Sequence, residues 1–424
     1  MRSGAGRDAV VIGGGAAGIA AARALHDAGR DVLLLEGKDR LGGRAHSMRL
    51  GLSGAGADAS GVPGQVTVDC GCGWLHSARR NPWTALAGAY GLTVDRTPTG
   101  WREQWRDLGF SPDEREAFGA AWEAMEAQAH GLLAGVDRPL ADAVAPGPWR
   151  LLIDAISGYA NGAQLANVSL HDWAAYEDAA TDDNWAVREG YGTLVARHAE
   201  GVSVRLGTRV LRIDHRGRTI RVETDAGTIE TGAVVVALPT TVLARGDVAF
   251  DPPLRDKQAA AEALPLGLAD KIFLVIDGPA FPANAHLIGD PHSACTASYR
   301  LAPFGQPLVE VFVGGDCAEM LERESDAGAA DFAIGELLRL LGRDWRFTPL
   351  ARTRWRHDPL IGGSYSHARV GMAGQRAVLA EPIDGRLFFA GEACSATDFS
   401  TAHGAYETGV AAAHALLATI AVPG

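Results

Sequence analysis

Hydrophobic positions at the start of the chain predict a strand, a helix and a second strand. Residues 8–12 (DAVVI) are a short apolar run typical of a buried strand. An alanine-rich helical stretch, AAGIAAARALHDAG, follows and ends at Gly29. A second apolar run, DVLLLE, ends at Glu36. This order predicts a βαβ unit with parallel strands.

Blocks of helical and strand periodicity alternate along the rest of the chain. Residues 79–189 contain amphipathic helical stretches, and 202–238 change to period-two strands with turns typical of a meander. Alternation returns at 269–277 and 309–315, followed by a helix near 328–342. Residues 387–391 (LFFAG) read as a buried strand, and Ser400 or Thr401 can cap a helix that begins near Ala402. The alternation indicates two interleaved domains.

Glycines between the first strand and helix match a dinucleotide-binding fingerprint. Gly13, Gly15 and Gly18 have the spacing G-x-G-x-x-G, and Glu36 ends the second strand. In this context the first glycine makes a tight turn, the second lets a pyrophosphate approach, and the third lets helix and strand pack closely. The helix N-terminus attracts the phosphates. Glu36 accepts hydrogen bonds from ribose hydroxyls but repels a phosphate, which argues against NADP.

A second glycine turn, Gly42-Gly43-Arg44, follows Glu36. It suits a cofactor that extends further into the protein and needs a cation near its phosphates or flavin ring. The glycines at 314–315 have the wrong spacing for a second fingerprint in strand–helix context. A single nucleotide site favours FAD and argues against a pyridine-nucleotide disulfide reductase.

Composition and charge narrow the class of protein. The 424 residues suit two or three domains, and 47% hydrophobic with 21% charged residues allow a large core. A net charge of −12 argues against nucleic acid and is compatible with a cationic substrate. No apolar run reaches the roughly 18 residues of a membrane span. The N-terminus lacks a signal-peptide pattern, so we expect a cytoplasmic protein.

Cysteine usage predicts neither a disulfide framework nor a metal site. The five cysteines are Cys70, Cys72, Cys295, Cys317 and Cys394. The odd number and the chain length argue against a disulfide framework. Cys70-Gly-Cys72 lacks the two-residue spacer of a zinc or redox pair, so we expect no metal.

Taken in order, these motifs resemble the flavin-containing amine oxidase family of monoamine oxidases, polyamine oxidases and amine-oxidase-type histone demethylases. The resemblance covers nearly the whole chain. Besides the fingerprint, it rests on 41–44 (LGGR), 69–76 (DCGCGWLH), 189–192 (EGYG), 269–271 (ADK), 355–359 (WRHDP), 363–366 (GSYS), 390–392 (AGE) and 403–405 (HGA).

The resemblance implies an α/β fold, with a Rossmann-like FAD-binding domain interleaved with a mixed-sheet plus helical substrate-binding domain. We expect FAD-binding parts at 1–78, 190–250 and 369–424, a helical substrate part at 79–189, and a second substrate part at 251–368. Val210 would meet adenine, Trp355 would pack beside the flavin ring, and Glu392 would contact the ribitol or phosphate region. The full set of expected cofactor residues is Gly13, Gly15, Gly18, Glu36, Gly43, Arg44, Val210, Trp355, Gly391, Glu392, Thr401 and Ala402.

The resemblance also implies three catalytic residues. Lys271 matches the lysine that holds a water near flavin N5 and is implicated in oxygen reactivity. Tyr365 and Thr401 match the two walls of the cage around the substrate nitrogen, a half-aromatic cage as in polyamine oxidases and the demethylases. The alternatives are an exposed strand lysine paired with Asp270 and a tyrosine of the core.

Three departures from the family restrict the prediction. Ser364 stands where monoamine oxidases carry the flavin-linked cysteine, so we expect noncovalent FAD. Trp74 replaces the carboxylate-binding arginine of L-amino-acid oxidases, which disfavours α-amino acids. The helical insertion of the demethylases' partner-binding tower is absent from the sequence, which disfavours histones.

The expected function is FAD-dependent oxidation of a small primary or secondary amine to an imine, then an aldehyde, with O2 reoxidising the flavin and a homodimer possible. One alternative is a FAD-dependent desaturase or dehydrogenase of a natural-product intermediate, and another is a non-catalytic flavoprotein. Pocket specificity is expected from 79–189 and 280–365. The candidate wall residues, each more typical of a core, are Trp74, His76, Trp101, Trp105, Trp173 and Trp185.

Overall fold

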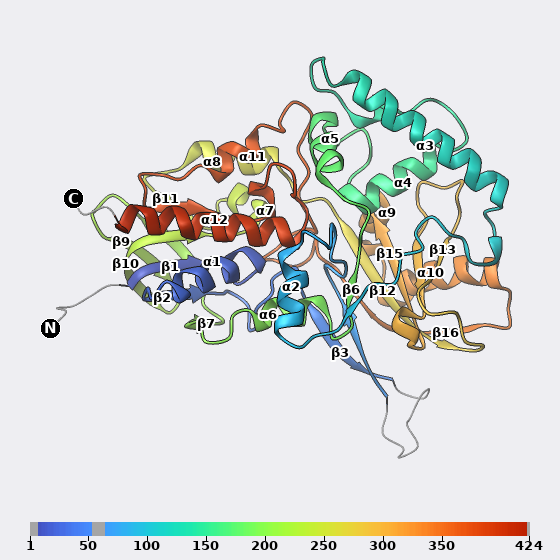
Figure 1. Ribbon diagram of the computed structural model, residues 1–424, viewed down its shortest axis with the longest axis horizontal. Coiled ribbons are helices and arrows are strands. Elements are labelled where there is room, and N and C mark those ends of the chain that lie inside the picture. Colours follow the sequence, from blue (N-terminus) through green and yellow to red (C-terminus); the bar gives the residue numbers. More distant parts are fainter. Residues whose placement is uncertain (1–6, 53–63, 422–424) are drawn as a thin grey trace.

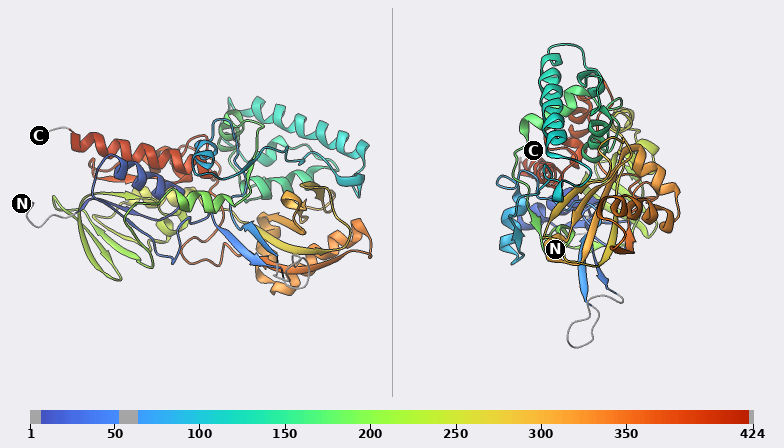
Figure 2. Two further views of the ribbon diagram at one scale, coloured as in Figure 1. Left: turned by 60° about the horizontal axis from the view of Figure 1, so that its bottom comes forward. Right: turned by 90° about the vertical axis from the view of Figure 1, so that its right-hand side faces the viewer.

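The computed structural model describes residues 7–52 and 64–421. The chain start, where no signal-peptide pattern was expected, includes residues 1–6, which lie outside this range. The molecule is elongated and has two lobes, each built around one sheet (Figure 1, Figure 2). Several segments cross between the lobes, as the alternating sequence blocks predicted.

The predicted βαβ unit forms the centre of the first lobe. Strand β1 (Arg7–Ile12) leads into helix α1 (Ala16–Asp27) and parallel strand β2 (Val32–Leu35). Helix α1 ends before Gly29, whose φ of 73° is the left-handed conformation that glycine adopts readily. Both strands are almost wholly buried because helices cover both faces of the sheet.

The first sheet has the strand order β11-β8-β9-β10-β1-β2-β7, with β17 also pairing with β10. Helices α1 and α12 lie side by side on one face (Figure 1), and α7, α8 and α11 pack on the other. The bounds are β7 (Val204–Arg205), β8 (Val210–Asp214), β9 (Ile220–Thr224), β10 (Gly227–Val236), β11 (Ala249–Asp251), β17 (Leu387–Phe389), α7 (Thr240–Arg245), α8 (Arg255–Ala263), α11 (Gln375–Ala380) and α12 (Ala402–Ala421).

The meander predicted for 202–238 is smaller than expected. Strands β8, β9 and β10 form it with antiparallel pairing, but β7 pairs in parallel with β2 at the far edge of the sheet. Period-two alternation predicts a strand but does not identify its partner, so the sequence could not separate β7 from the meander.

The second lobe contains an antiparallel sheet of order β13-β14-β15-β12-β16. Helices α9 and α10 cover one face, and the other face lines a cavity beneath α4. The alternation predicted at 269–277 gives a strand buried from Ala269 to Ile276, because both faces of the sheet are covered. The bounds are β12 (Ala269–Asp277), β13 (Ala285–Ile288), β14 (Ser298–Leu301), β15 (Leu308–Gly314), β16 (Arg346–Arg352), α9 (Gly315–Arg323) and α10 (Asp326–Leu341).

Helices α3 and α4 of the segment 79–189 lie over the second lobe, whereas α2 packs on α6 and α12 of the first lobe (Figure 1). The longest, α3 (Pro112–Leu132), begins with a reciprocal capping box between Ser111 and Glu114. The other elements are β3 (Ser47–Gly51), β4 (Gln65–Asp69), α2 (Pro82–Ala89), β5 (Val94–Asp95), α4 (Arg150–Asn161), α5 (Leu170–Ala179), β6 (Ala186–Val187) and α6 (Tyr191–Arg197), with short 3-10 turns at Trp105–Asp107, Leu140–Ala143, Pro303–Gly305 and Glu392–Cys394.

A buried ion pair joins the helical layer to the first lobe. Arg376 at the start of α11 donates two hydrogen bonds, of 2.6 and 2.8 Å, to Asp172 in the first turn of α5. Both side chains are 2% exposed. The same carboxylate accepts a bond from the backbone N–H of Ala368. A two-bond arginine–carboxylate pair fixes orientation as well as distance, so α5 is held against the first lobe.

The expectation that argued against disulfides was wrong for one pair. Cys295, in the loop between β13 and β14, forms a disulfide with Cys317 in the first turn of α9. Their Cα atoms are 4.9 Å apart. Cysteine parity and chain length argue against a network of disulfides, but not against one bond between two segments that the fold brings together. Cys70, Cys72 and Cys394 are free thiols.

Across 7–52 and 64–421, no helix is both long and apolar enough to cross a membrane. The same residues contain no group of three or more His, Cys, Asp or Glu side chains arranged to hold a metal ion.

Candidate active site

One cavity of about 710 Å³ runs between the two lobes and is lined by both. Gly15, Glu36 and Val210 of the first lobe line the cavity. Lys271 and Arg300, on the sheet of the second lobe, line it as well. This volume lies in the usual range for ligand sites. All the sequence-predicted site residues line this cavity except Gly18, which lies beneath its floor.

The glycine turn fits a dinucleotide phosphate. A Cβ on Gly18 would lie 1.8 Å from the carbonyl oxygen of Gly13, so this position is closed by helix–strand packing. A Cβ on Gly15 would meet no heavy atom within 4 Å, so this position opens into the cavity. The second glycine turn is joined to the first, because Gly42 N donates to Gly14 O at 2.8 Å. Both turns therefore expose backbone to one ligand, as the fingerprint requires.

Glu36 lies directly after β2 and is 8% exposed. Its two carboxylate oxygens accept hydrogen bonds from the backbone N–H groups of Gly14 at 2.6 Å and Lys38 at 2.8 Å. These bonds fix the carboxylate at the edge of the cavity, where its remaining lone pairs can accept from ribose hydroxyls.

Arg44 and Glu392 form an ion pair in the cavity wall. Arg44 Nη1 donates to Glu392 Oε1 at 2.8 Å and to the carbonyl oxygen of Ser364 at 2.7 Å. Glu392 also accepts from Ser366 Oγ at 2.6 Å and from Ser400 N at 2.9 Å. Burial alone raises the pKa of Glu392, but Arg44 and these donors outweigh burial and lower it. Glu392 therefore stays charged and orients Arg44.

Trp355 and Thr401 line the cavity near the centre of the molecule. Trp355 Nε1 donates to the carbonyl oxygen of Cys70, and the indole is 6% exposed. Thr401 is the N-cap of α12, because its Oγ1 accepts from Gly404 N at 3.0 Å. The same hydroxyl donates to Asp398 O at 2.6 Å, which leaves the methyl group for contact with a ligand. Gly391 and Ala402 line the cavity beside it.

Lys271 is buried, which contradicts the alternative of an exposed strand lysine paired with Asp270. Its side chain is 6% exposed, and Nζ donates to Asp69 O at 2.9 Å. The ion-pair partner is Glu310 on β15, whose Oε1 lies 2.5 Å from Nζ. Asp270 instead accepts from Thr353 Oγ1 and Trp355 N, because adjacent strand residues point to opposite faces.

Cross-strand pairing places a polar row beside Lys271 on the cavity floor. His286, Arg300 and Glu310 lie directly opposite one another on β13, β14 and β15. Arg300 stacks over Trp74, with 4.5 Å between the guanidinium carbon and the ring centre, and donates twice to Asn284 Oδ1. Burial alone raises the pKa of Glu310, but Lys271 and then Arg300 outweigh burial and lower it. Glu310 is therefore a buried carboxylate shared by two cations.

Tyr365 is held by helix α4. Its hydroxyl donates to the carbonyl oxygen of Tyr159, and both side chains line the cavity. Burial raises the pKa of Tyr365 well above its ordinary value, so the hydroxyl stays protonated as a donor. The Tyr365 ring therefore forms a fixed part of the cavity wall.

His76 presents a neutral imidazole to the cavity. Its Nδ1 lies 2.6 Å from Asn184 Oδ1, and Asn184 Nδ2 donates to Asp182 O at 3.1 Å. The amide oxygen can only accept, so we assign the proton to His76 Nδ1. Burial lowers the pKa of His76 to about 4, so the ring is neutral at pH 7. Nε2 is then left as a hydrogen-bond acceptor.

Comparisons with known proteins show the family of this chain. A family model described as flavin containing amine oxidoreductase matches residues 16–177 and 136–417. The chain is 30% identical to polyamine oxidase 2 of Arabidopsis thaliana, over 95% of this chain and 86% of the relative. The chain belongs to this family. Its cofactor is FAD, and the protein is an amine oxidase.

Similar proteins also include a histone demethylase and, among solved structures, two amine oxidases. Lysine-specific histone demethylase 1 homolog 2 of Arabidopsis thaliana is 28% identical over 96% of this chain and 58% of its own length. Among solved structures, cyclohexylamine oxidase from Brevibacterium oxydans IH-35A has a TM-score of 0.78 at 20% identity, covering 98% of this chain and 100% of that chain. Putrescine oxidase bound to putrescine has a TM-score of 0.76 at 18% identity, covering 97% and 99%. These two structures confirm the fold.

The structure of this amine oxidase divides the candidate wall residues into two groups. Trp74, His76 and Trp101 line the cavity, so their assignment to the core was wrong. Trp173 is 4% exposed in the core of the helical layer, and Trp105 packs against Phe281. Neither of these two, nor Trp185, lines the cavity.

Sequence reasoning did not find Tyr159, Glu310 or Arg300 in this site. Glu310 and Arg300 lie in alternating strand segments that offer no motif, and Tyr159 lies within an amphipathic helix. Only the pairing of β14 with β15 and the packing of α4 on β15 bring them to the cavity. A charged residue inside an apolar strand was the one available signal, and VEVFV carries it at Glu310.

Proposed function

We propose that this amine oxidase converts a primary or secondary amine to an imine, which water hydrolyses to an aldehyde. The observation that carries the proposal is the continuous cavity, which joins the dinucleotide-binding glycines to a pocket containing Lys271, Tyr365 and His76. FAD, held by the glycine turns, Glu36 and Arg44, would supply the redox chemistry: a hydride acceptor for the carbon next to nitrogen and a donor of the electron pair that reduces O2 to hydrogen peroxide.

The protein's contribution is to bind a neutral amine and hold it in place. An ammonium group has no lone pair to support hydride loss, so the substrate nitrogen must lose its proton first. An apolar wall disfavours the charged form. Tyr365 and the methyl group of Thr401 form such a wall, and His76 Nε2 can accept a hydrogen bond from the substrate N–H. These contacts orient the nitrogen and the carbon beside it.

Lys271 is the residue we propose for reactivity with oxygen. The ammonium is held by Asp69 O and Glu310, which leaves one of its three N–H donors for a water molecule. This water is the proposed link between Lys271 and the flavin. Slower consumption of O2 by a Lys271→Met variant, at an unchanged rate of anaerobic flavin reduction, would support this role.

We propose that FAD is held without a covalent bond. Ser364 occupies the position of the linking cysteine, and its hydroxyl donates to Gly267 O at 3.2 Å. An alcohol does not form the thioether of the covalent enzymes. Acid precipitation of the purified protein should therefore leave the yellow colour in the supernatant, whereas a yellow pellet would contradict this point.

The decisive experiment is anaerobic mixing of the purified protein with spermidine, putrescine, phenylethylamine, tryptamine and an L-amino acid in turn. Bleaching of the oxidised flavin band by one amine would support the proposal and identify the substrate class. If dithionite bleaches the flavin but no amine does, the desaturase or natural-product dehydrogenase alternative takes its place. A homodimer and a cytoplasmic location stay predictions of the sequence.

A further inference from the structure

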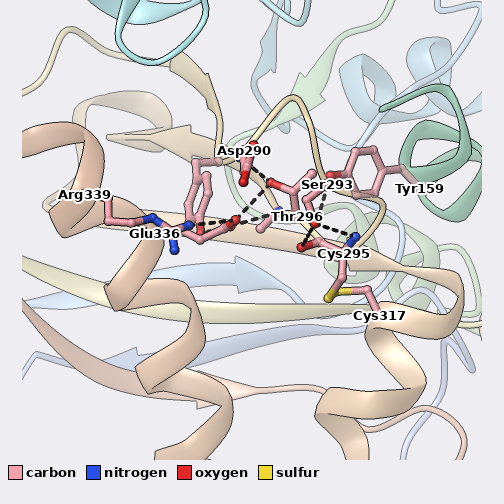
Figure 3. The surroundings of a disulfide bond; sticks show 10 residues. Tyr159, Asp290, Ser293, Cys295, Thr296, Cys317, Glu336 and Arg339 are labelled. Carbon is pink, nitrogen blue, oxygen red and sulfur yellow. Dashed lines mark hydrogen bonds and ion pairs between the residues drawn. A yellow bond between two sulfur atoms is a disulfide. The ribbon is translucent and has the colours of Figure 1, made fainter. Parts of the chain in front are cut away.

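The disulfide between Cys295 and Cys317 joins two segments that hold the same helix (Figure 3). Cys295 belongs to the loop between β13 and β14, and Cys317 to the first turn of α9. Helix α4, which carries the cavity residue Tyr159, contacts both segments. The loop, the disulfide, α9 and α4 therefore form a closed ring of contacts.

On the loop side of the ring, the contact with α4 is made by the Tyr159 hydroxyl. Tyr159 Oη donates a hydrogen bond of 2.7 Å to the carbonyl oxygen of Thr296, the residue next to Cys295. Within the loop, Ser293 Oγ donates to Cys295 O at 3.0 Å and accepts from Cys295 N at 3.1 Å (Figure 3). The position of Tyr159 thus depends on a loop that the disulfide secures.

On the α9 side of the ring, the contact with α4 is made at Gly158, one residue before Tyr159. A Cβ on Gly314, at the N-cap of α9, would lie 1.9 Å from the carbonyl oxygen of Gly158, so the two backbones are in direct contact. Tyr159 is therefore held between the loop and the start of α9, and these are the two segments that the disulfide joins.

Tyr159 also holds Tyr365, one wall of the proposed cage around the substrate nitrogen. Its carbonyl oxygen accepts the hydroxyl of Tyr365, the proposed wall beside the substrate nitrogen. Cys295 is thus connected to Tyr365 in three steps. They are the peptide bond to Thr296, the hydrogen bond from Tyr159 Oη to Thr296 O, and the hydrogen bond from the Tyr365 hydroxyl to Tyr159 O.

A second anchor limits what breaking the disulfide can do. Glu336 of α10 is 3% exposed and accepts from Thr296 Oγ1 at 3.0 Å, Ala297 N at 3.1 Å and Tyr299 Oη at 2.7 Å. These bonds keep the start of β14 in place without the disulfide. Thr296 is itself held by Glu336, so reduction should shift the loop and α4 slightly rather than release them, while the sheet stays folded.

We propose that the Cys295–Cys317 bond is a site of reversible thiol–disulfide exchange that adjusts the substrate cage through Tyr159. The proposal extends the proposed amine oxidation, since its activity readout uses that reaction. Cys295 is half-buried and Cys317 is 4% exposed, so Cys295 is the less buried of the two. The reductant is a dithiol. One thiolate attacks Cys295 Sγ, Cys317 leaves as a thiolate and takes a proton, and the second thiol then displaces Cys295. Two electrons and two protons pass to the protein, and the dithiol becomes a disulfide.

The test uses the holoenzyme with and without dithiothreitol. Alkylation and mass spectrometry should detect thiols at 295 and 317 only after treatment. The rate of anaerobic flavin reduction by the amine should fall about three- to tenfold, since small misplacements of positioning groups slow reaction. Reduction by dithionite and the FAD content should not change, and reoxidation should restore the rate. An unchanged amine rate in fully reduced protein overturns the proposal, as does an equal loss of the dithionite reaction.

Two variants separate the cage effect from other effects of the reductant. The double variant Cys295→Ala/Cys317→Ala should show the lower rate and ignore dithiothreitol, although Cys70, Cys72 and Cys394 remain. Tyr159→Phe removes the hydroxyl but keeps the carbonyl oxygen, and it should also lower the rate and lose the response. A full response to the dithiol in either variant overturns the proposal.

A readout without substrate distinguishes this proposal from the proposed function. Reduction should speed amide hydrogen exchange in 150–161 and 289–297 and leave α1 unchanged, because α1 lies in the other lobe. If no amine bleaches the flavin, amine oxidation fails, but this exchange pattern still tests the mechanical link. Equal exchange in both redox states overturns the link even when an amine substrate is known.

Discussion

Lys271 Nζ lies 2.5 Å from Glu310 Oε1, and Arg300 Nη1 lies 3.9 Å from the other oxygen of the same carboxylate. Two buried cations therefore share one anion on the cavity floor. Glu310→Gln would leave both cations uncompensated and repel an ammonium substrate on its way into the pocket. We expect the KM for the amine to rise about tenfold or more, equivalent to ~1.4 kcal/mol, with a smaller change in kcat.

The control for this variant is Glu319→Gln, which removes a half-exposed acid on α9 outside the cavity. Its kinetics should match those of the unmodified enzyme. Steady-state rates over a range of amine concentration give both parameters. Equal KM values for Glu310→Gln and the unmodified protein would show that the carboxylate does not influence substrate binding.

Gly15→Ala should remove cofactor binding without unfolding the protein. The backbone at Gly15 has φ −82° and ψ −176°, which alanine accepts, and its Cβ would meet no protein atom within 4 Å. The methyl group would occupy the space that a pyrophosphate needs, so we expect the Kd for FAD to rise about tenfold or more. Stability of the cofactor-free protein should change by less than about 0.5 kcal/mol.

Substitutions at two other glycines serve as controls for Gly15→Ala. Gly119→Ala lies in α3, with no atom near its Cβ, and should leave FAD binding unchanged. Gly18→Ala should destabilise the protein itself, because its Cβ would lie 1.8 Å from Gly13 O. Titration of each refolded apoprotein with FAD, followed by flavin fluorescence, gives the dissociation constants. Normal FAD affinity in Gly15→Ala would mean that the phosphates lie elsewhere.

His76→Phe tests the acceptor that faces the pocket. The variant keeps an aromatic ring near Trp101, whose ring centre lies 6.2 Å from that of His76, but removes Nε2. Losing one hydrogen bond to the amine should raise its apparent Kd about three- to tenfold in anaerobic flavin reduction. Dithionite reduction and FAD content serve as controls. A larger loss of FAD than of amine affinity would contradict a role in substrate binding.

Buried histidines should make the folded protein sensitive to mild acid. Burial lowers the pKa to about 4 in His46, His76, His198, His286 and His367. Between pH 6.5 and 4 the unfolded chain binds more protons at these sites than the folded chain, so stability falls as the pH falls through this window. Six carboxyl groups act in the opposite direction, because burial raises their pKa: Asp270 and Glu177 to about 7, and also Asp69, Asp316, Glu336 and Glu407. The contribution of the histidines is therefore measured by comparing a histidine variant with the unmodified protein.

Thermal unfolding measured from pH 7.5 to 4.5 checks this prediction. Relative to pH 7.5, the midpoint of His367→Gln at pH 4.5 should be higher than that of the unmodified protein, because the variant lacks one imidazole whose pKa is lowered by folding. His414→Gln changes an exposed residue of α12 and should keep the full slope. A midpoint that rises below pH 6.5 would show that the carboxylates, not the histidines, control stability there.

The sequence predicted those parts of the molecule whose local pattern determines their structure. The βαβ unit, the glycine turn and a cap of α12 at Ser400 or Thr401 all follow from short-range rules, and the structure shows the first two and selects Thr401 as the cap. It also predicted the family and the cofactor, because the motifs occur in order along the chain. The roles of Lys271, Tyr365 and Thr401 stay predictions, although all three line one cavity.

The other contacts of the site and the disulfide depend on which segments the fold places side by side. Glu310 replaced Asp270 as the partner of Lys271 because pairing of β12 with β15 decides which side chains share a face. The disulfide depended on a loop and a helix that are 22 residues apart in sequence. The segment VEVFV marks Glu310 as unusual but not as the partner of Lys271, and nothing within one segment marks the pairing of the two cysteines, so pattern reading could not find either contact.

The Arg376–Asp172 pair limits how this enzyme can be divided. It ties α5 to α11, two helices far apart in the sequence, deep inside the protein. We expect that a fragment containing only one of the two helices would leave a buried charge without its partner, and that cleavage in a surface loop would leave a nicked but intact enzyme. Transplanting a new substrate pocket into this scaffold would have to carry Asp172 along, or the donor segment would leave a buried guanidinium without its carboxylate.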